Sequence, residues 1–185
     1  MKLEEYVKEI KDTPERFEEV KLGSETRSMS NLTMELGMYD NYSVLLRGNL
    51  TKVEDFFRKK GYKKPTEETT YFNHAKGLGS LSVSEGMENA HTLYVDENDP
   101  RGKELLDKMG TLYNISVMFH PFELANPPKK MRVSQPKACA IMVMDLVECI
   151  KQHQISACFL TSTGWNHEGD FSRIVFYEPK EEQVA

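Results

Sequence analysis

The fold is decided by residues 134–177, which read SQPKACAIMVMDLVECIKQHQISACFLTSTGWNHEGDFSRIVFY. The stretch from Pro136 to about His153 is apolar on nearly every side at first and polar on one side later, which predicts a helix packed against a sheet. Residues Ile155 to Leu160 are apolar except for one serine, as in a strand covered on both faces. A turn from Gly164 to Asp170 then leads into a second predicted strand, Phe171 to Tyr177. This succession places the closing third of the chain at the centre of the fold.

The turn between the two strands holds the polar residues best suited to contact a partner. It contains the only tryptophan of the chain beside a histidine and two carboxylates: Trp165, Asn166, His167, Glu168 and Asp170. A histidine beside an acid could act as a general base, but no serine or cysteine is fixed beside it in a nucleophile-elbow pattern. Tryptophan anchors protein interfaces through its large apolar area. We therefore expect a partner-binding turn and assign no catalytic residue.

Upstream, a succession of strand, polar cap, helix and glycine occurs twice. The first copy runs from Leu46 to Gly61 and the second from Val95 to Gly110, at a constant offset of 49 residues. Thr51 and Glu54 have the spacing of a capping box in the first copy. An amphipathic helix at residues 3–11 precedes both copies. The pattern predicts an α+β fold, with a mostly antiparallel mixed sheet, helices on one face and two split βαβ, or ferredoxin-like, units.

The length of the chain fits one domain. Its 185 residues predict a single α/β domain spanning residues 1–185. Within it, sub-units at residues 1–122 and 131–185 would be joined by a linker at residues 123–130, where two prolines adjoin each other.

Composition and charge exclude several classes of protein. The formal net charge is −5, which argues against broad nucleic-acid binding because such binding needs a basic face. Two local basic runs could hold an anion, although such runs are more often solvated loop ends: Lys59, Lys60, Lys63 and Lys64, and Lys129, Lys130 and Arg132. Three cysteines without a CxxC pair, no apolar signal core and no membrane-spanning stretch lead us to expect a cytoplasmic protein that does not bind membranes.

The start of the closing helix offers an alternative function. Gln135 and Ala140 match the motif Arg/Gln-x-x-Gly-x-Gly/Ala, so this segment resembles the acyl-CoA loop of GNAT-type acetyltransferases. The resemblance covers about a quarter of the chain, and it implies a V-shaped groove between splayed strands, where backbone N–H groups around Gln135, Ala138 and Ala140 hold a pyrophosphate. The sequence departs from the family at Ala138, where the motif has glycine, and at Pro136, which lacks a backbone donor.

A metal site is a further alternative that we weigh and do not assign. Cys149 and His153 lie four residues apart on the predicted helix, and Cys158 lies in the next strand. Zinc requires a fourth ligand, or three ligands and water, and Cys139 is nearly three turns away. Buried thiols and a satisfied histidine explain these residues better. We expect no metal and no cofactor.

These observations favour a non-catalytic protein–protein interaction module that acts as a regulator, an inhibitor or an assembly component. The sequence holds no complete catalytic or cofactor motif, and its ten methionines suit an interface if some of them are exposed. Inhibitors and virion parts of viruses and mobile elements have this profile. The partner would be a protein, in a homo-oligomer or a larger assembly. The enzyme alternative is the GNAT-like, acyl-CoA-dependent acyltransferase.

Overall fold

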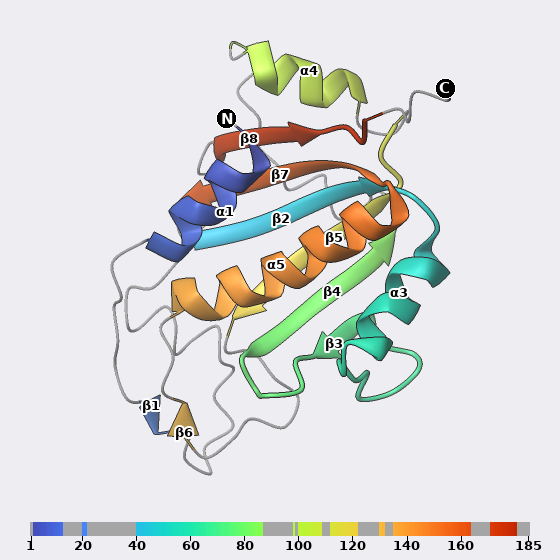
Figure 1. Ribbon diagram of the computed structural model, residues 1–185, viewed down its shortest axis with the longest axis vertical. Helices are drawn as coiled ribbons and strands as arrows, with labels where there is room; N and C mark the ends of the chain where they lie inside the picture. Colours follow the sequence, from blue (N-terminus) through green and yellow to red (C-terminus); the bar gives the residue numbers. More distant parts are fainter. Residues whose placement is uncertain are drawn as a thin grey trace.

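The computed structural model describes residues 2–12, 20–21, 40–86, 98, 100–108, 112–121, 130–131, 135–163 and 171–180 (Figure 1). The helices within these residues are α1 (Leu3–Asp12), α3 (Leu50–Lys59), α4 (Pro100–Lys108) and α5 (Gln135–His153). The strands are β1 (Val20–Lys21), β2 (Asp40–Arg47), β3 (Tyr71–Asn73), β4 (Gly79–Glu85), β5 (Ile115–Pro121), β6 (Lys130–Met131), β7 (Ser156–Thr163) and β8 (Phe171–Tyr177). The prediction of an α+β fold is confirmed, and so are the closing helix and its two strands.

Six strands form one sheet in the order β3-β4-β5-β2-β7-β8, in which every neighbouring pair is antiparallel. β2 therefore runs parallel to β4 with β5 between them, and β5 runs parallel to β7 with β2 between them. The connection from β5 through α5 to β7 joins two parallel strands across β2, which is the arrangement of a split βαβ unit, whereas the connection from β2 through α3 reaches β4 only after the edge strand β3. A relation to ferredoxin-like proteins stays a prediction.

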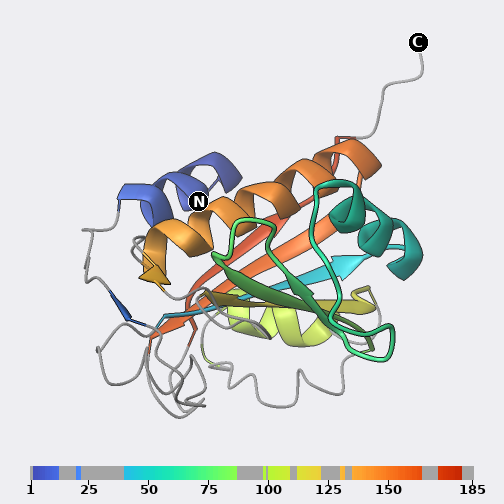
Figure 2. The same ribbon diagram turned by 90° about the horizontal axis from the view of Figure 1, so that it is seen from below.

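The sequence repeat does not correspond to two such units. α3 of the first copy packs with α1 and α5 on one sheet face, whereas α4 of the second copy lies on the opposite face (Figure 2). Leu105 of α4 is buried there with Leu45 and Cys158. The strand predicted at residues 91–95 lies outside the described residues. The prediction that the helices pack on one face of the sheet therefore holds for α1, α3 and α5. α4 lies on the other face.

The six-stranded sheet contains strands from both sides of the predicted linker. β7, which follows the linker in sequence, pairs along its whole length with β2, which precedes it. In the same way β1 pairs with β6 in a separate two-stranded ribbon. Residues 122–129, which include most of the predicted linker, lie outside the described residues. The described strands on the two sides of the linker thus complete one sheet.

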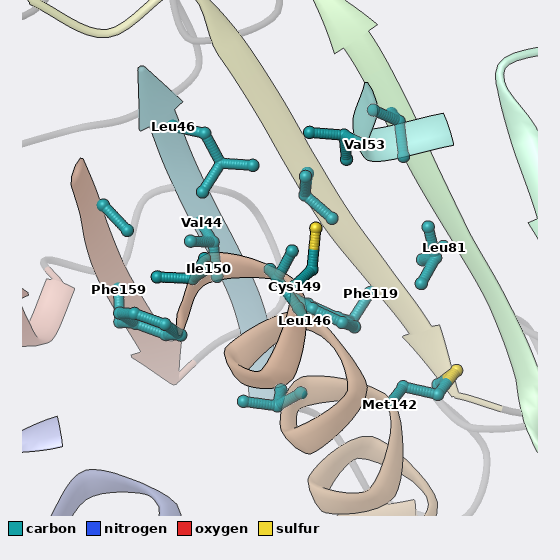
Figure 3. Close-up of a cluster of buried hydrophobic side chains, with 14 of the residues drawn as sticks. Val44, Leu46, Val53, Leu81, Phe119, Met142, Leu146, Cys149, Ile150 and Phe159 are labelled. Atoms are coloured by element: carbon teal, nitrogen blue, oxygen red, sulfur yellow. The ribbon is translucent and has the colours of Figure 1, made fainter. Parts of the chain in front are cut away.

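The alternation of side chains along the strands separates two cores. In β2, Val44 and Leu46 join the cluster under α1, α3 and α5, whereas Leu45 joins the cluster under α4. Figure 3 shows the first cluster, in which Leu146 and Ile150 of α5 face the sheet together with Cys149, Met142 and strand residues such as Phe159. Burying one such aliphatic side chain contributes about 1.5–3 kcal/mol, so α5 is held by its packing and not by helix propensity.

The start of α3 differs from the capping-box prediction by two residues. Asn49 is the N-cap, since its backbone is extended and its side chain accepts a hydrogen bond from the Lys52 N–H at 3.1 Å. Thr51 lies within the helix, and Glu54 pairs with Lys64 at 3.1 Å instead of closing the box. An asparagine competes with threonine for the cap because its side-chain oxygen serves the same N–H groups at least as well.

The turn between β2 and α3 is fixed to β5 by one side chain. Asn114 Oδ1 accepts from the Gly48 N–H at 2.9 Å, and Asn114 Nδ2 donates to the Gly48 carbonyl at 2.8 Å. The Asn114 N–H also donates to the carbonyl of Leu46 at 2.9 Å. α3 therefore begins at a position set by two neighbouring strands.

Candidate functional site

A groove of about 330 Å³ lies between α1 and α5. Both figures of the whole chain show these two helices side by side on the sheet (Figure 2). We call it the α1–α5 groove, and it is lined by Leu3, Glu4, Val7, Lys8, Met144, Val147 and Lys151. Its apolar residues form the floor and its three charged residues form the rim.

α1 forms one wall because its buried residues follow the helical period. Leu3, Tyr6 and Ile10 are spaced three and four residues apart, and all three are buried in the core. The Tyr6 hydroxyl lies 2.6 Å from Thr161 Oγ1 on β7, and the Tyr6 ring packs on Phe159 with centroids 5.5 Å apart. The helix predicted at residues 3–11 is confirmed. Its rotation leaves Val7 only partly covered, on the side of α5.

α5 forms the other wall and departs from the sequence prediction at one residue. Its first half is expected to be buried on every side, and Met142 and Val143 are indeed fully buried. Met144, however, is 41% exposed and lines the groove together with the partly buried Val147. The continuous apolar run in the sequence does not show that Met144 is exposed, because the helical period turns this residue away from the sheet while its neighbours face the core.

The rim of the groove carries two lysines and one glutamate. Lys151 Nζ lies 3.5 Å from Glu4 Oε1, which links the two helices across the groove, although both side chains are well exposed. A backbone hydrogen bond at Glu4, aided by Lys151, lowers the pKa of the Glu4 carboxyl. Lys8, one helical turn from Glu4, has no ion-pair partner among the described residues. The rim is therefore locally positive on a chain that is negative overall.

These residues suit binding better than chemistry. The described lining offers methyl and thioether groups at the floor, with no histidine, cysteine, serine or threonine that could serve as a nucleophile or a base near neutral pH. An apolar floor with a charged rim is the composition of a contact surface. Methionine adapts its shape to different partners because its side chain is unbranched.

The turn predicted to bind a partner lies outside the described residues. Trp165, Asn166, His167, Glu168 and Asp170 all belong to residues 164–170, and their partner-binding role stays a prediction. The strands on both sides of the turn are described. β7 ends at Thr163 and β8 begins at Phe171, and the two strands pair antiparallel with a register shift between Thr161 and Ser162.

The segment that resembles an acyl-CoA loop lies in helical backbone from its first residue. α5 begins at Gln135, and both Ala138 and Ala140 are buried against the core. The following strand, β7, has β2 and β8 as its sheet neighbours, and both are antiparallel to it. β5 and β7, which run parallel, are separated by β2, so the described strands differ from the splayed pair that the resemblance implies. Binding of an acyl-CoA stays an untested alternative.

The cysteines considered as metal ligands lie on different faces of the sheet. Cys149 belongs to the core under α5, and Cys158 belongs to the core under α4. Burial raises the pKa of the Cys149 thiol to about 12 and also raises the pKa of the Cys158 thiol, so both thiols are protonated at neutral pH. Among the described residues, no group of three His, Cys, Asp or Glu side chains is placed to hold a metal ion.

The other flank of α5 carries a cluster of aromatic and polar side chains that the sequence pattern does not predict. We call it the α3–α5 seam, and its members are Phe57, Lys60, Tyr62, Asp145 and Glu148. The Tyr62 hydroxyl donates to Asp145 Oδ2 at 2.7 Å, and Lys60 Nζ pairs with Glu148 and lies 3.9 Å from Asp145 Oδ1. Burial, and the hydrogen bond that Tyr62 donates to Asp145, raise the pKa of the Tyr62 hydroxyl well above its ordinary value.

Two lysines of the basic run near the end of α3, Lys60 and Lys64, form ion pairs. Lys60 serves Asp145 and Glu148, Lys64 pairs with Glu54 and lies over the Phe72 ring, and Arg58 pairs with acids on its own helix. The sequence does not reveal the partners of Lys60, which come from α5, a helix more than 70 residues further on. The second basic run lies outside the residues whose side chains are described.

The second face of the sheet holds a row of serines that the sequence analysis also passed over. Ser80 and Ser82 on β4 and Ser116 on β5 are buried, and the alternation of serine with apolar residues in β4 is the signal that could have found them. Ser82 Oγ lies 3.4 Å from His120 Nε2, and the Tyr71 ring packs on the His120 ring. The serine–histidine distance exceeds the usual reach of a nucleophile and its base, so this pair carries no catalytic assignment.

Comparison with known proteins adds no family: no protein-family model, curated protein or solved structure matches this chain. Within the described residues, no helix combines the length and the apolar character needed to cross a membrane.

Proposed function

We propose that the protein is a non-catalytic interaction module that acts as a regulator, an inhibitor or an assembly component of a protein partner. The observation that carries the proposal is the α1–α5 groove, with its apolar floor, its exposed Met144 and its charged rim. Val7 and Val147, which line the groove, are partly buried and pack against the core, so the apolar lining of the groove is continuous with the core. A partner that fills it would exclude water from apolar area that the fold itself leaves uncovered.

The other large exposed apolar side chains of the described chain supply a matched control. Leu106 on α4 is 39% exposed and Tyr71 on β3 is 42% exposed, values close to that of Met144. Neither residue lines the groove. Isolated exposed apolar residues are common on protein surfaces and need no partner. The groove, and not exposure as such, distinguishes Met144.

The experiment is affinity purification from the native host with three tagged forms: the wild-type protein, Met144→Asp and Leu106→Asp. We expect at least one protein to be retained by the wild type and by Leu106→Asp and to be lost from Met144→Asp, because only the latter places a carboxylate in the groove. Circular dichroism and unfolding curves of the three forms establish that each is folded. Recovery of the same proteins with all three forms would exclude the groove as the contact surface.

The acyltransferase alternative gives a different result in a second measurement. Calorimetric titration with millimolar acetyl-CoA should give no heat of binding if the protein is an interaction module. Saturable binding, weakened by a change at Gln135, would instead support the acyl-CoA reading of the α5 start.

A further inference from the structure

The shape of the α1–α5 groove restricts what can fill it. On α1 the floor residues Leu3 and Val7 lie one turn apart, and on α5 the lining extends from Met144 through Val147 to Lys151, two turns of helix. At 1.5 Å per residue the groove is about 10 Å long. It therefore accommodates apolar side chains that recur over about two helical turns.

The walls of the groove restrict the backbone of the occupant. Both walls are helices, whose mid-helix N–H and C=O groups are already paired within each helix. An extended peptide would find no backbone partners along them, unlike at a sheet edge, and its own polar groups would lose water without compensation. A helix pairs its own backbone and presents residues at i and i+4 to the groove between two others.

The rim determines the charge of the occupant. Lys8 and Lys151 stand against a single Glu4, and Glu4 is already paired with Lys151. The lining carries one net positive charge on a chain whose net charge is −5, so acidic residues of a partner are better placed beside this rim than over the acidic surface of the chain. The same net charge opposes association of two copies of the chain.

We propose that the α1–α5 groove binds an amphipathic helix of a partner protein, which inserts apolar side chains spaced one turn apart and places acidic residues beside Lys8 and Lys151. The proposal rests on the proposed function and adds the class of partner to it. The contacts of Met144 and Val147 with the apolar side chains provide affinity, and the lysines select the charge of the flanking residues.

The test uses two labelled helical peptides of about 16 residues, long enough to form helix in isolation. They share one apolar stripe, and their flanking positions are glutamates in one peptide and lysines in the other. Binding is measured by fluorescence anisotropy to the wild-type protein and to Lys8→Glu, Met144→Asp and Lys52→Glu. Lys52 is an exposed lysine on α3, so Lys52→Glu makes the same change of charge away from the groove.

We expect the wild type to bind the acidic peptide at least about threefold more tightly than the basic one, since exposed charge pairs each contribute little. Lys8→Glu should remove or reverse this preference, and Met144→Asp should abolish binding of both peptides. Lys52→Glu should change neither the affinity nor the preference for the acidic peptide. Added salt should reduce the preference. This pattern supports the proposal.

Three results would overturn it: equal affinity for the two peptides, binding that survives Met144→Asp, or a concentration-dependent dimer that Met144→Asp disrupts. If neither peptide binds while Met144→Asp still loses a co-purified protein, the helical partner class is wrong and the proposed function stands. If Met144→Asp also loses no co-purified protein, both fail.

Discussion

The two flanks of α5 differ although they belong to one helix. Toward α3, the Phe57 ring contacts Phe56, Tyr62 and Phe72 edge to face or tilted, and the Tyr62 hydroxyl donates to Asp145 above them. Toward α1, the groove is lined by apolar side chains such as Val7, Met144 and Val147, and among the described residues one exposed ion pair, Glu4 with Lys151, crosses it. α1 packs closely on α5 through its buried residues, yet an open groove remains beside this contact, whereas aromatic rings and polar side chains join the end of α3 to α5.

The difference predicts which substitutions affect stability and which affect the proposed binding. Aromatic rings and a buried tyrosine hydroxyl contribute to folding because their partners are present within the chain. The floor of the groove contributes less to folding than it would if it were covered, and it gains that contribution only when a partner binds. Substitutions in the seam should therefore change stability, and substitutions in the groove should change binding.

The largest effect is expected for Phe57→Ala, which removes a fully buried ring from the α3–α5 seam. The cavity and the lost apolar burial should lower the free energy of unfolding by about 3–5 kcal/mol. The change in the groove is Val7→Ala, for which we expect a loss of about 1 kcal/mol or less because the residue is only partly buried, and Val53→Ala on α3, where the valine is fully buried, is the matched change of the same size. Urea unfolding monitored by circular dichroism measures all three variants, and equal losses would remove the distinction between the two flanks.

A smaller effect is expected for Tyr62→Phe, which keeps the ring and removes only the hydroxyl. Loss of the hydrogen bond to Asp145 should cost about 0.5–1.5 kcal/mol. Tyr71→Phe is the control, since Tyr71 is exposed and its change should leave stability unaltered. If Tyr62→Phe and Tyr71→Phe changed the free energy of unfolding equally, ring packing alone would stabilise the seam.

The seam should also respond to pH through His74. Its ring packs edge to face on Tyr62, and its Nδ1 accepts from the Lys76 N–H at 3.0 Å. Burial lowers the pKa of His74 despite the nearby Asp145, and Lys76 lowers it as well. The unfolded chain therefore binds the proton more tightly, and stability should fall as pH drops below the ordinary histidine pKa of 6.5 and through the lowered folded pKa.

The measurement is the difference in pH dependence between the wild type and His74→Gln. Unfolding midpoints taken across this pH range should decline more steeply toward acid for the wild type. A wild-type curve as flat as that of the variant, or a rise in stability toward acid, would contradict the direction of the shift.

The smallest effect on stability is expected for Glu4→Gln, which breaks the ion pair with Lys151 across the groove. Both side chains are well exposed, so solvent and salt screen the pair and the thermal midpoint should not change measurably. A clear drop in the midpoint would mean that the ion pair closes the groove as part of the fold.

The sequence predicts the helices and strands of this molecule better than their arrangement in space. The α5 helix, β7, β8 and the first helix follow from hydrophobic period alone, because each signal is local. The placement of α4 on the second sheet face depends on pairing between distant strands, which a repeat of letters does not encode. The exposure of Met144 depends on the rotation of α5 over the sheet, and the Tyr62–Asp145 bond joins residues 83 positions apart. The candidate site depends on how the elements are arranged in space, and the sequence pattern therefore does not predict it.

The central claim is that the partner binds in the α1–α5 groove, and NMR of methyl-labelled methionines tests it most directly. Met142 and Met144 are two residues apart on α5, one fully buried and one 41% exposed in the groove. Substitution to leucine assigns the two signals. On addition of the co-purified partner, the Met144 methyl signal should shift while the Met142 signal stays in place. Binding of the partner without a shift of Met144 would contradict the claim.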